Sequence, residues 1–124
     1  MVDHLKKEGF MKSKIAVPIT DGYEFIEVDQ IIYCRSSNNY TYIIQKDETE
    51  TLVCKTMKEV EAVLQQFFFL RIHQSYLVNP NYMKKFSRNQ GGIIIMNNND
   101  TIPVSKSKRD LVVNVFESIK RLMD

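Results

Sequence analysis

The chain has 124 residues, 44% of them hydrophobic and 26% charged, which fits a single soluble domain with one modest core. Its apolar runs are at most four residues long, which excludes a membrane-spanning helix of about 20 apolar residues, and residues 1–10 lack the apolar stretch of a secretory signal. The net charge of +2 conceals an asymmetry, because residues 1–70 sum to −3 whereas residues 71–109 sum to +6. This basic block suits a polyanionic partner such as nucleic acid, and a merely solvated basic surface is the alternative.

Short strands separated by turn residues dominate the first half of the chain. Asp21-Gly22 marks one turn and Asn38-Asn39 another, because Gly and Asn tolerate the positive φ of a tight connection. Cys34 and Cys54 lie in apolar, strand-like contexts without metal-binding spacing, so we expect buried free thiols in a reducing cytoplasm, with a disulfide as the alternative. The expected strands are residues 15–18, 24–28, 31–35, 40–45 and 51–54.

A helix is expected after Thr56. Thr56 and Glu59 have the Ser/Thr-x-x-Glu spacing of a capping box, in which each side chain bonds the backbone N–H of the other residue. Apolar side chains then recur at helical spacing, at Met57, Val60, Val63, Leu64 and Phe67. We expect this apolar stripe to face the core.

Residues 69–79 read Phe-Leu-Arg-Ile-His-Gln-Ser-Tyr-Leu-Val-Asn, and their alternation of apolar and polar side chains predicts one extended segment with a buried face. The polar residues are all able to bond phosphates or base edges. Arg71 and His73 share one side of this strand. Strict alternation places Gln74 on the apolar side, whereas a turn or bulge at the strand end exposes it. Asn79 precedes a proline, and we expect it to close a turn through its side chain.

The second half continues with strands expected over residues 82–86, 93–96 and 101–104. A C-terminal helix is predicted after Ser107, which is followed by Asp110 at the third position of a similar cap. Its apolar stripe comprises Leu111, Val112, Val115, Phe116, Ile119 and Leu122. Two helices among many short strands indicate a mainly β, α+β architecture.

Sequence motifs of the common enzyme classes are missing. His73-x-Ser75 matches one half of the paired signature of two-histidine phosphoesterases, but the other histidine, His4, has no hydroxyl residue two positions later. The sequence also lacks a Gly-x-Ser-x-Gly elbow, a P-loop, a dinucleotide-binding glycine motif and a zinc-ligand spacing. We therefore expect no catalytic residues, no metal site and no cofactor.

With these blocks in view, the chain resembles the LytTR domains, the DNA-binding modules of many bacterial response regulators. The most characteristic match is Phe69 to Asn79, which fits the family block Phe-x-Arg-x-His-x-Ser-(aromatic or aliphatic)-x-Val-Asn. Three further blocks match in order, namely residues 31–43, residues 56–64 and residues 102–106, and the whole match spans about residues 14–122. We assign residues 1–13 to an N-terminal tail and residues 14–124 to the LytTR-like domain.

The resemblance implies an elongated stack of small antiparallel β-sheets with a short helix in the middle and a C-terminal helix. It implies double-stranded DNA as the partner, with inter-strand loops entering the major groove, paired direct repeats as sites and a homodimer on the DNA. It further implies a cytoplasmic bacterial transcription regulator with no membrane contact. Because 13 residues precede the match, we expect this sequence to lack the receiver domain that usually precedes the module in the family.

Site residues follow by motif position and by charge. The resemblance implicates the first hairpin loop (Asn38, Asn39 and Tyr40), the pair His73 and Gln74, and Lys106. Charge adds the phosphate-binding candidates Lys84, Lys85, Arg88, Lys108 and Arg109. Asn39, Gln74 and Lys106 are the expected base readers, and the family match favours an exposed Gln74.

Several assignments have alternatives. His73 either donates to DNA or holds neighbouring backbone, and Arg71 either orients His73 or bridges to the acidic half of the chain. Many relatives carry Arg or Lys where this chain has Gln74, and often Arg where it has Lys106; because Gln favours adenine, a relative's DNA site does not transfer. The alternative functions are a single-stranded DNA or RNA binder, which would show an exposed row of aromatic rings, and a protein-interaction module.

Overall fold

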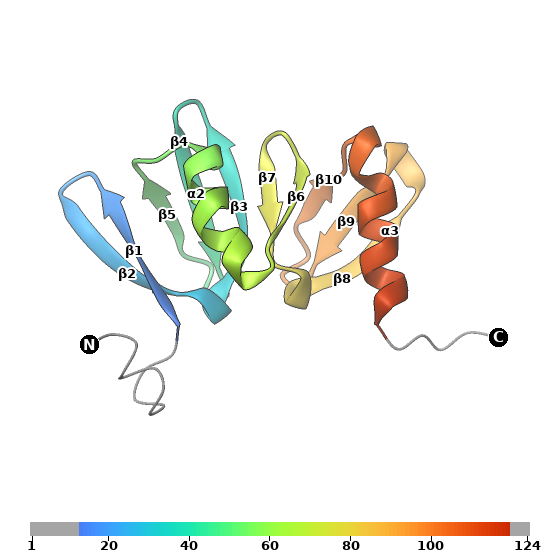
Figure 1. Cartoon of the computed structure of the whole chain (residues 1–124), viewed down its shortest axis with the longest axis horizontal. Coiled ribbons are helices and arrows are strands. Elements are labelled where there is room, and N and C mark those ends of the chain that lie inside the picture. The colour runs from blue at the N-terminus through green and yellow to red at the C-terminus, as the bar shows by residue number, and fades with distance from the viewer. Residues whose placement is uncertain (1–12, 120–124) are drawn as a thin grey trace.

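Three antiparallel β-sheets stand side by side along the long axis of the molecule (Figure 1). The structure is a computed structural model that describes residues 13–119. Within this range the elements are β1 (Lys14–Ile19), β2 (Gly22–Glu27), β3 (Ile31–Ser37), β4 (Tyr40–Gln45), β5 (Glu50–Val53), α2 (Met57–Leu64), β6 (Leu70–His73), β7 (Tyr76–Val78), β8 (Met83–Ser87), β9 (Ile93–Met96), β10 (Thr101–Pro103) and α3 (Arg109–Ser118).

The sheets have the orders β1-β2, β5-β4-β3-β7-β6 and β10-β9-β8. The five-stranded sheet lies in the centre, with the β1-β2 hairpin at one end of the molecule and the third sheet with α3 at the other (Figure 1). This arrangement confirms the expected elongated stack with one helix in the middle and one at the C-terminus.

Both faces of the central sheet are buried, because its strands carry apolar residues at successive positions. Ile43 and Leu77 face a first core with Leu64 of α2, whereas the next residues along their strands, Ile44 and Val78, face a second core under the third sheet and α3. Fully burying one such side chain stabilises the fold by about 1.5–3 kcal/mol. The central sheet is therefore the frame on which both outer units are fixed.

The capping box predicted for the middle helix is confirmed. The Thr56 hydroxyl accepts from the Glu59 N–H at 3.3 Å, and Glu59 Oε1 accepts from the Thr56 N–H at 3.0 Å. The cap predicted at Ser107 is wrong. Lys106–Lys108 form a 3-10 turn, and α3 begins at Arg109 without a side-chain cap. Leu122, the last member of the predicted stripe, lies outside the described residues, as do residues 1–12 of the expected tail.

The prediction of one extended segment over residues 69–79 is also wrong. Leu70–His73 and Tyr76–Val78 form a hairpin, with Gln74 and Ser75 as its two-residue turn. Alternation of polar and apolar residues is the same in one long strand and in two short arms, so the pattern does not distinguish them. In the structure the side chains of Arg71 and His73 bond the backbone of the turn.

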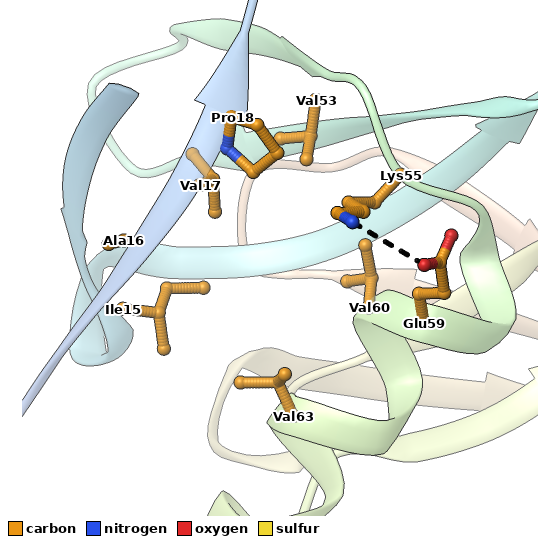
Figure 2. A pocket seen from close by; sticks show the side chains of 9 residues that line it. All are labelled: Ile15, Ala16, Val17, Pro18, Val53, Lys55, Glu59, Val60 and Val63. Carbon is orange, nitrogen blue, oxygen red and sulfur yellow. Dashed lines mark ion pairs between the residues drawn. The ribbon is translucent and has the colours of Figure 1, made fainter. Parts of the chain in front are cut away.

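An apolar cleft of about 280 Å³ separates β1 from α2 (Figure 2). The ion pair between Lys55 Nζ and Glu59 Oε2, 3.6 Å apart, lies among its otherwise largely aliphatic walls. None of the predicted DNA-binding residues lines this cleft.

Residues 13–119 contain no helix with the length and hydropathy needed to span a bilayer.

The two cysteines are free, as predicted, with Cys34 buried and Cys54 half-buried. Burial raises the pKa of the Cys34 thiol well above its usual range.

Candidate nucleic-acid interface

Three polar segments are tied together along one edge of the molecule by backbone hydrogen bonds. The Ser36 N–H at the end of β3 donates to the Ser75 carbonyl in the β6-β7 turn at 2.9 Å. The Ser105 N–H, next to Lys106, donates to the Ile72 carbonyl of β6 at 2.9 Å. The β3-β4 turn, the β6-β7 turn and the start of α3 accordingly lie along the upper edge in Figure 1.

The first segment is the two-residue turn between β3 and β4. Asn38 has a φ of +56°, which the short amide side chain tolerates better than a bulky one. Asn38 and Asn39 are exposed, and Tyr40, which pairs with Ser37 across the hairpin, is 48% exposed. The predicted loop therefore presents two amides and one phenol to solvent.

The second segment is the β6-β7 turn. Gln74 is exposed in this turn, as the family match favoured. His73 Nδ1 accepts a hydrogen bond from the Ser75 N–H at 3.0 Å, and the ring packs edge-on against Tyr76. In the neutral imidazole this bond places the proton on Nε2, which is then a donor. His73 thus holds neighbouring backbone, one of the two alternatives, and also keeps a donor for a ligand.

The Arg71 side chain holds the backbone of this turn. Its guanidinium donates to Glu61 Oε1 at 2.6 Å, to the His73 carbonyl at 2.9 Å and to the Gln74 carbonyl at 2.5 Å. The bridge to the acidic half of the chain is therefore present, and the same side chain also holds the His73 backbone.

The third segment follows β10. Lys106 is exposed in the 3-10 turn, while Lys108 and Arg109 are half-buried. The Arg109 side chain lies against the backbone of Gly91 and Gly92, where φ values of +82° and +108° and the close approach both favour glycine. Its Nε is buried and has no hydrogen-bond partner among the described residues.

Arg88 and Arg109 line the same small hollow beside the start of α3. The Arg88 guanidinium lies over the Phe86 ring, 5.8 Å from its centroid. The β8-β9 connection therefore adds one cation next to the third segment.

Comparison with known proteins identifies the domain. The family model described as LytTr DNA-binding domain matches residues 21–117. The chain belongs to the LytTR family of DNA-binding domains. Sensory transduction protein LytT of Bacillus subtilis (strain 168) is 27% identical over 96 residues, which cover 76% of this chain and 39% of that protein. The chain therefore spans about two fifths of the length of this curated relative.

The fold agrees with a solved structure. A LytTr DNA-binding domain from Bacillus cereus superimposes with a TM-score of 0.70 at 24% identity, covering 86% of this chain and 98% of that one. At this identity the likeness shows the fold, and the family model shows the membership.

Lys84 and Lys85 lie apart from the three segments of this LytTR domain. Lys84 Nζ donates to Asn99 Oδ1 in the β9-β10 turn at 2.9 Å. Because β10 runs from that turn toward Lys106, Lys84 is at the opposite end of the third sheet from Lys106. Lys85 is exposed and pairs with Ile95 within the sheet. The structure thus does not bring Lys84 together with the other basic candidates.

Sequence reasoning did not single out Arg35. On β3 this residue is in register with Tyr42 of β4 on one side and Tyr76 of β7 on the other. It immediately precedes Ser36, whose N–H donates to the Ser75 carbonyl of the β6-β7 turn. Its guanidinium lies 4.9 Å from the Tyr42 ring centroid and pairs with Glu50 at 3.2 Å. Tyr42, Arg35 and Tyr76 become neighbours only through the strand order β4-β3-β7, and the sequence carries no local signal for that order.

Proposed function

We propose that this LytTR domain binds duplex DNA by inserting its three edge segments into the major groove and so regulates transcription. The observation that carries the proposal is the pair of backbone bonds, Ser36 to Ser75 and Ser105 to Ile72, which hold three exposed polar segments along one edge. The major groove distinguishes all four base pairs, so a rigid edge of polar side chains is suited to reading it.

Base reading is assigned to the exposed side chains of Asn39, Gln74 and Lys106. The amides of Asn39 and Gln74 suit adenine, which offers one acceptor and one donor, whereas the Lys106 ammonium suits the two acceptors of guanine. Asn38 and Tyr40 flank Asn39 and complete the first loop.

Phosphate binding is assigned to cationic and donor groups beside these readers. His73 Nε2, Lys108, Arg109 and Arg88 lie in or next to the edge segments, and each neutralised phosphate releases counterions. Lys84 and Lys85 were predicted for the same role, but their positions along β8 support it less well.

The cellular role of the domain is inferred from its family. We infer a cytoplasmic bacterial regulator that acts as a response-regulator output domain and binds paired direct repeats as two protomers. Family membership supports this inference.

A mobility-shift assay tests the proposal. A duplex selected from a random pool is bound by the protein and then challenged with duplex or single-stranded competitor of the same sequence. We expect duplex to compete at least tenfold better, because grooves exist only in the duplex. Preference for the single strand would overturn the proposal, and binding that does not weaken with salt would point to a protein partner instead.

One observation favours the single-stranded alternative. Tyr23 and Phe25 are 82% and 71% exposed, and as alternate residues of β2 they share one face of the hairpin, where bases could stack. The rings of Tyr42, Tyr76 and Tyr82, by contrast, pack against the second core. Phe25→Ala separates the two functions: it leaves duplex binding unchanged if the loop edge binds DNA and weakens binding if β2 stacks bases.

A further inference from the structure

We propose that Arg71 is a positioning residue for base reading, and that Glu61 makes α2 part of the DNA-reading apparatus. This inference rests on the proposed function and deepens it. The Arg71 guanidinium contacts three groups: the Glu61 carboxylate on α2 and the carbonyls of the two residues, His73 and Gln74, that the proposed function directs at DNA.

The geometry requires arginine. Nε donates to the His73 carbonyl, Nη2 to the Gln74 carbonyl and Nη1 to Glu61, so three nitrogens of one planar fork are used in three directions. A lysine ammonium carries the same charge on a single atom and cannot span these acceptors together. The side chain is therefore selected for its shape as well as its charge.

The contacts also fix the backbone of the turn. The carbonyls of His73 and Gln74 are bound by Arg71, the Ser75 N–H by His73 Nδ1, and the Ser75 carbonyl by the Ser36 N–H. The turn that carries Gln74 is thereby ordered before DNA arrives. A disordered turn would instead lose conformational entropy on binding, which weakens affinity for every sequence, and it would let Gln74 take other positions, which weakens discrimination between bases.

Arg71 is unsuited to gripping phosphate in this arrangement. Its partner Glu61 Oε1 lies 2.6 Å from Nη1, and the two side chains are only 22% and 30% exposed. An anion would have to displace this carboxylate and two carbonyls. The positive charge at Arg71 is therefore used inside the protein, unlike those of Lys106 and Lys108.

Glu61 is held by α2 and the first core, outside the β6-β7 turn itself. It lies on α2, whose residues Met57, Val60 and Leu64 are buried in the first core and whose first turn has the capping box. Any displacement of α2 is transmitted through the Glu61–Arg71 pair to the β6-β7 turn. Base reading by Gln74 then depends on the position of α2 as well as on the turn itself.

The test measures base discrimination position by position on the selected duplex. The substitutions Gln74→Ala and Lys106→Ala first identify the base pairs that each side chain reads. Arg71→Lys and Glu61→Ala are then compared with wild type. We expect each to reduce discrimination about tenfold at the Gln74 base pairs and to leave the Lys106 base pairs unchanged. Glu24→Ala, which removes one carboxylate from β2, is the matched charge control.

The opposite results overturn the inference. If Arg71 grips phosphate, Arg71→Lys retains near-wild-type binding, and Glu61→Ala strengthens binding to every sequence more than Glu24→Ala does. A misfolded variant would lose discrimination at both sets of base pairs, and a thermal melt of each variant detects it. If Gln74→Ala changes discrimination at no base pair, Gln74 is not a base reader and the inference about Arg71 fails. If the same variant still binds the selected duplex, the proposed function stands without Gln74.

Discussion

Asn79 shows how single polar residues hold this fold together. It is buried, its Nδ2 donates to the Ile31 carbonyl at 3.0 Å, and its Oδ1 accepts from the Asn81 N–H at 3.1 Å. The local bond confirms the prediction that Asn79 closes a turn. The bond to Ile31 crosses 48 positions of sequence, and no local pattern predicts it.

Replacing Asn79 with alanine leaves the Ile31 carbonyl and the Asn81 N–H without these partners. We expect Asn79→Ala to lower the free energy of unfolding by about 1–3 kcal/mol, because a buried polar group left unpaired loses its solvation as well as its bond. Urea denaturation measures the change, with Asn89→Ala at an exposed position as the control. Equal transition midpoints for the two variants would show that the Asn79 bonds add nothing to stability.

At the scale of elements, α2 and α3 show what sequence patterns predict well and what they do not. The start of α2 was predicted because its cap and its buried stripe are local to residues 56–64. The start of α3 was misplaced because the preceding chain is held by tertiary contacts: both the N–H and the hydroxyl of Ser105 donate to the Ile72 carbonyl. Long-range bonds of this kind have no local signature.

The apolar stripe predicted for α3 is only partly buried, because burial also depends on tertiary contacts. Val112 is fully buried, whereas Leu111 and Ile119 are 37% and 62% exposed. Helical spacing predicts which residues share a face, but neighbouring sheets decide how much of that face is covered. The family blocks, by contrast, predicted the order of the elements and the exposed position of Gln74.

The capping box makes a testable contribution to α2. A helix of eight residues is marginal by itself, so the cap and the buried stripe must both stabilise it. We expect Thr56→Ala to destabilise the domain by about 1 kcal/mol, because it removes the hydroxyl that accepts from the Glu59 N–H. Thermal denaturation monitored by circular dichroism measures this loss. Thr56→Ser keeps the acceptor and should melt like wild type; equal losses in both variants would contradict a capping role.

At the scale of the whole molecule, the charge asymmetry of the sequence does not become two charged halves. The central sheet combines β3, β4 and β5 from the acidic half with β6 and β7 from the basic half. Arg71 of the basic block pairs with Glu61 of the acidic half. Conversely, the Tyr33 hydroxyl of the acidic half donates to Asp100 of the basic block at 2.8 Å. Linear charge therefore overstates the number of cations that one DNA duplex can reach.

Salt dependence distinguishes the cations at the loop edge from those elsewhere. Each phosphate contact contributes about 0.9 to the slope of log affinity against log salt concentration. We expect Lys108→Ala to reduce that slope by about 1 and to weaken all sequences alike, whereas Lys106→Ala mainly relaxes base preference by about 1–3 kcal/mol. Lys84→Ala should leave the slope unchanged, because Lys84 is bonded to Asn99 at the far end of the third sheet.

The three variants together locate the DNA on the molecule. Titrations of the selected duplex at several salt concentrations give one slope for each protein. A slope reduced equally by Lys84→Ala and Lys108→Ala would mean that DNA extends from the start of α3 to the β9-β10 turn. Because these regions lie at opposite ends of β10, the duplex would then run along the third sheet and not along the three edge segments.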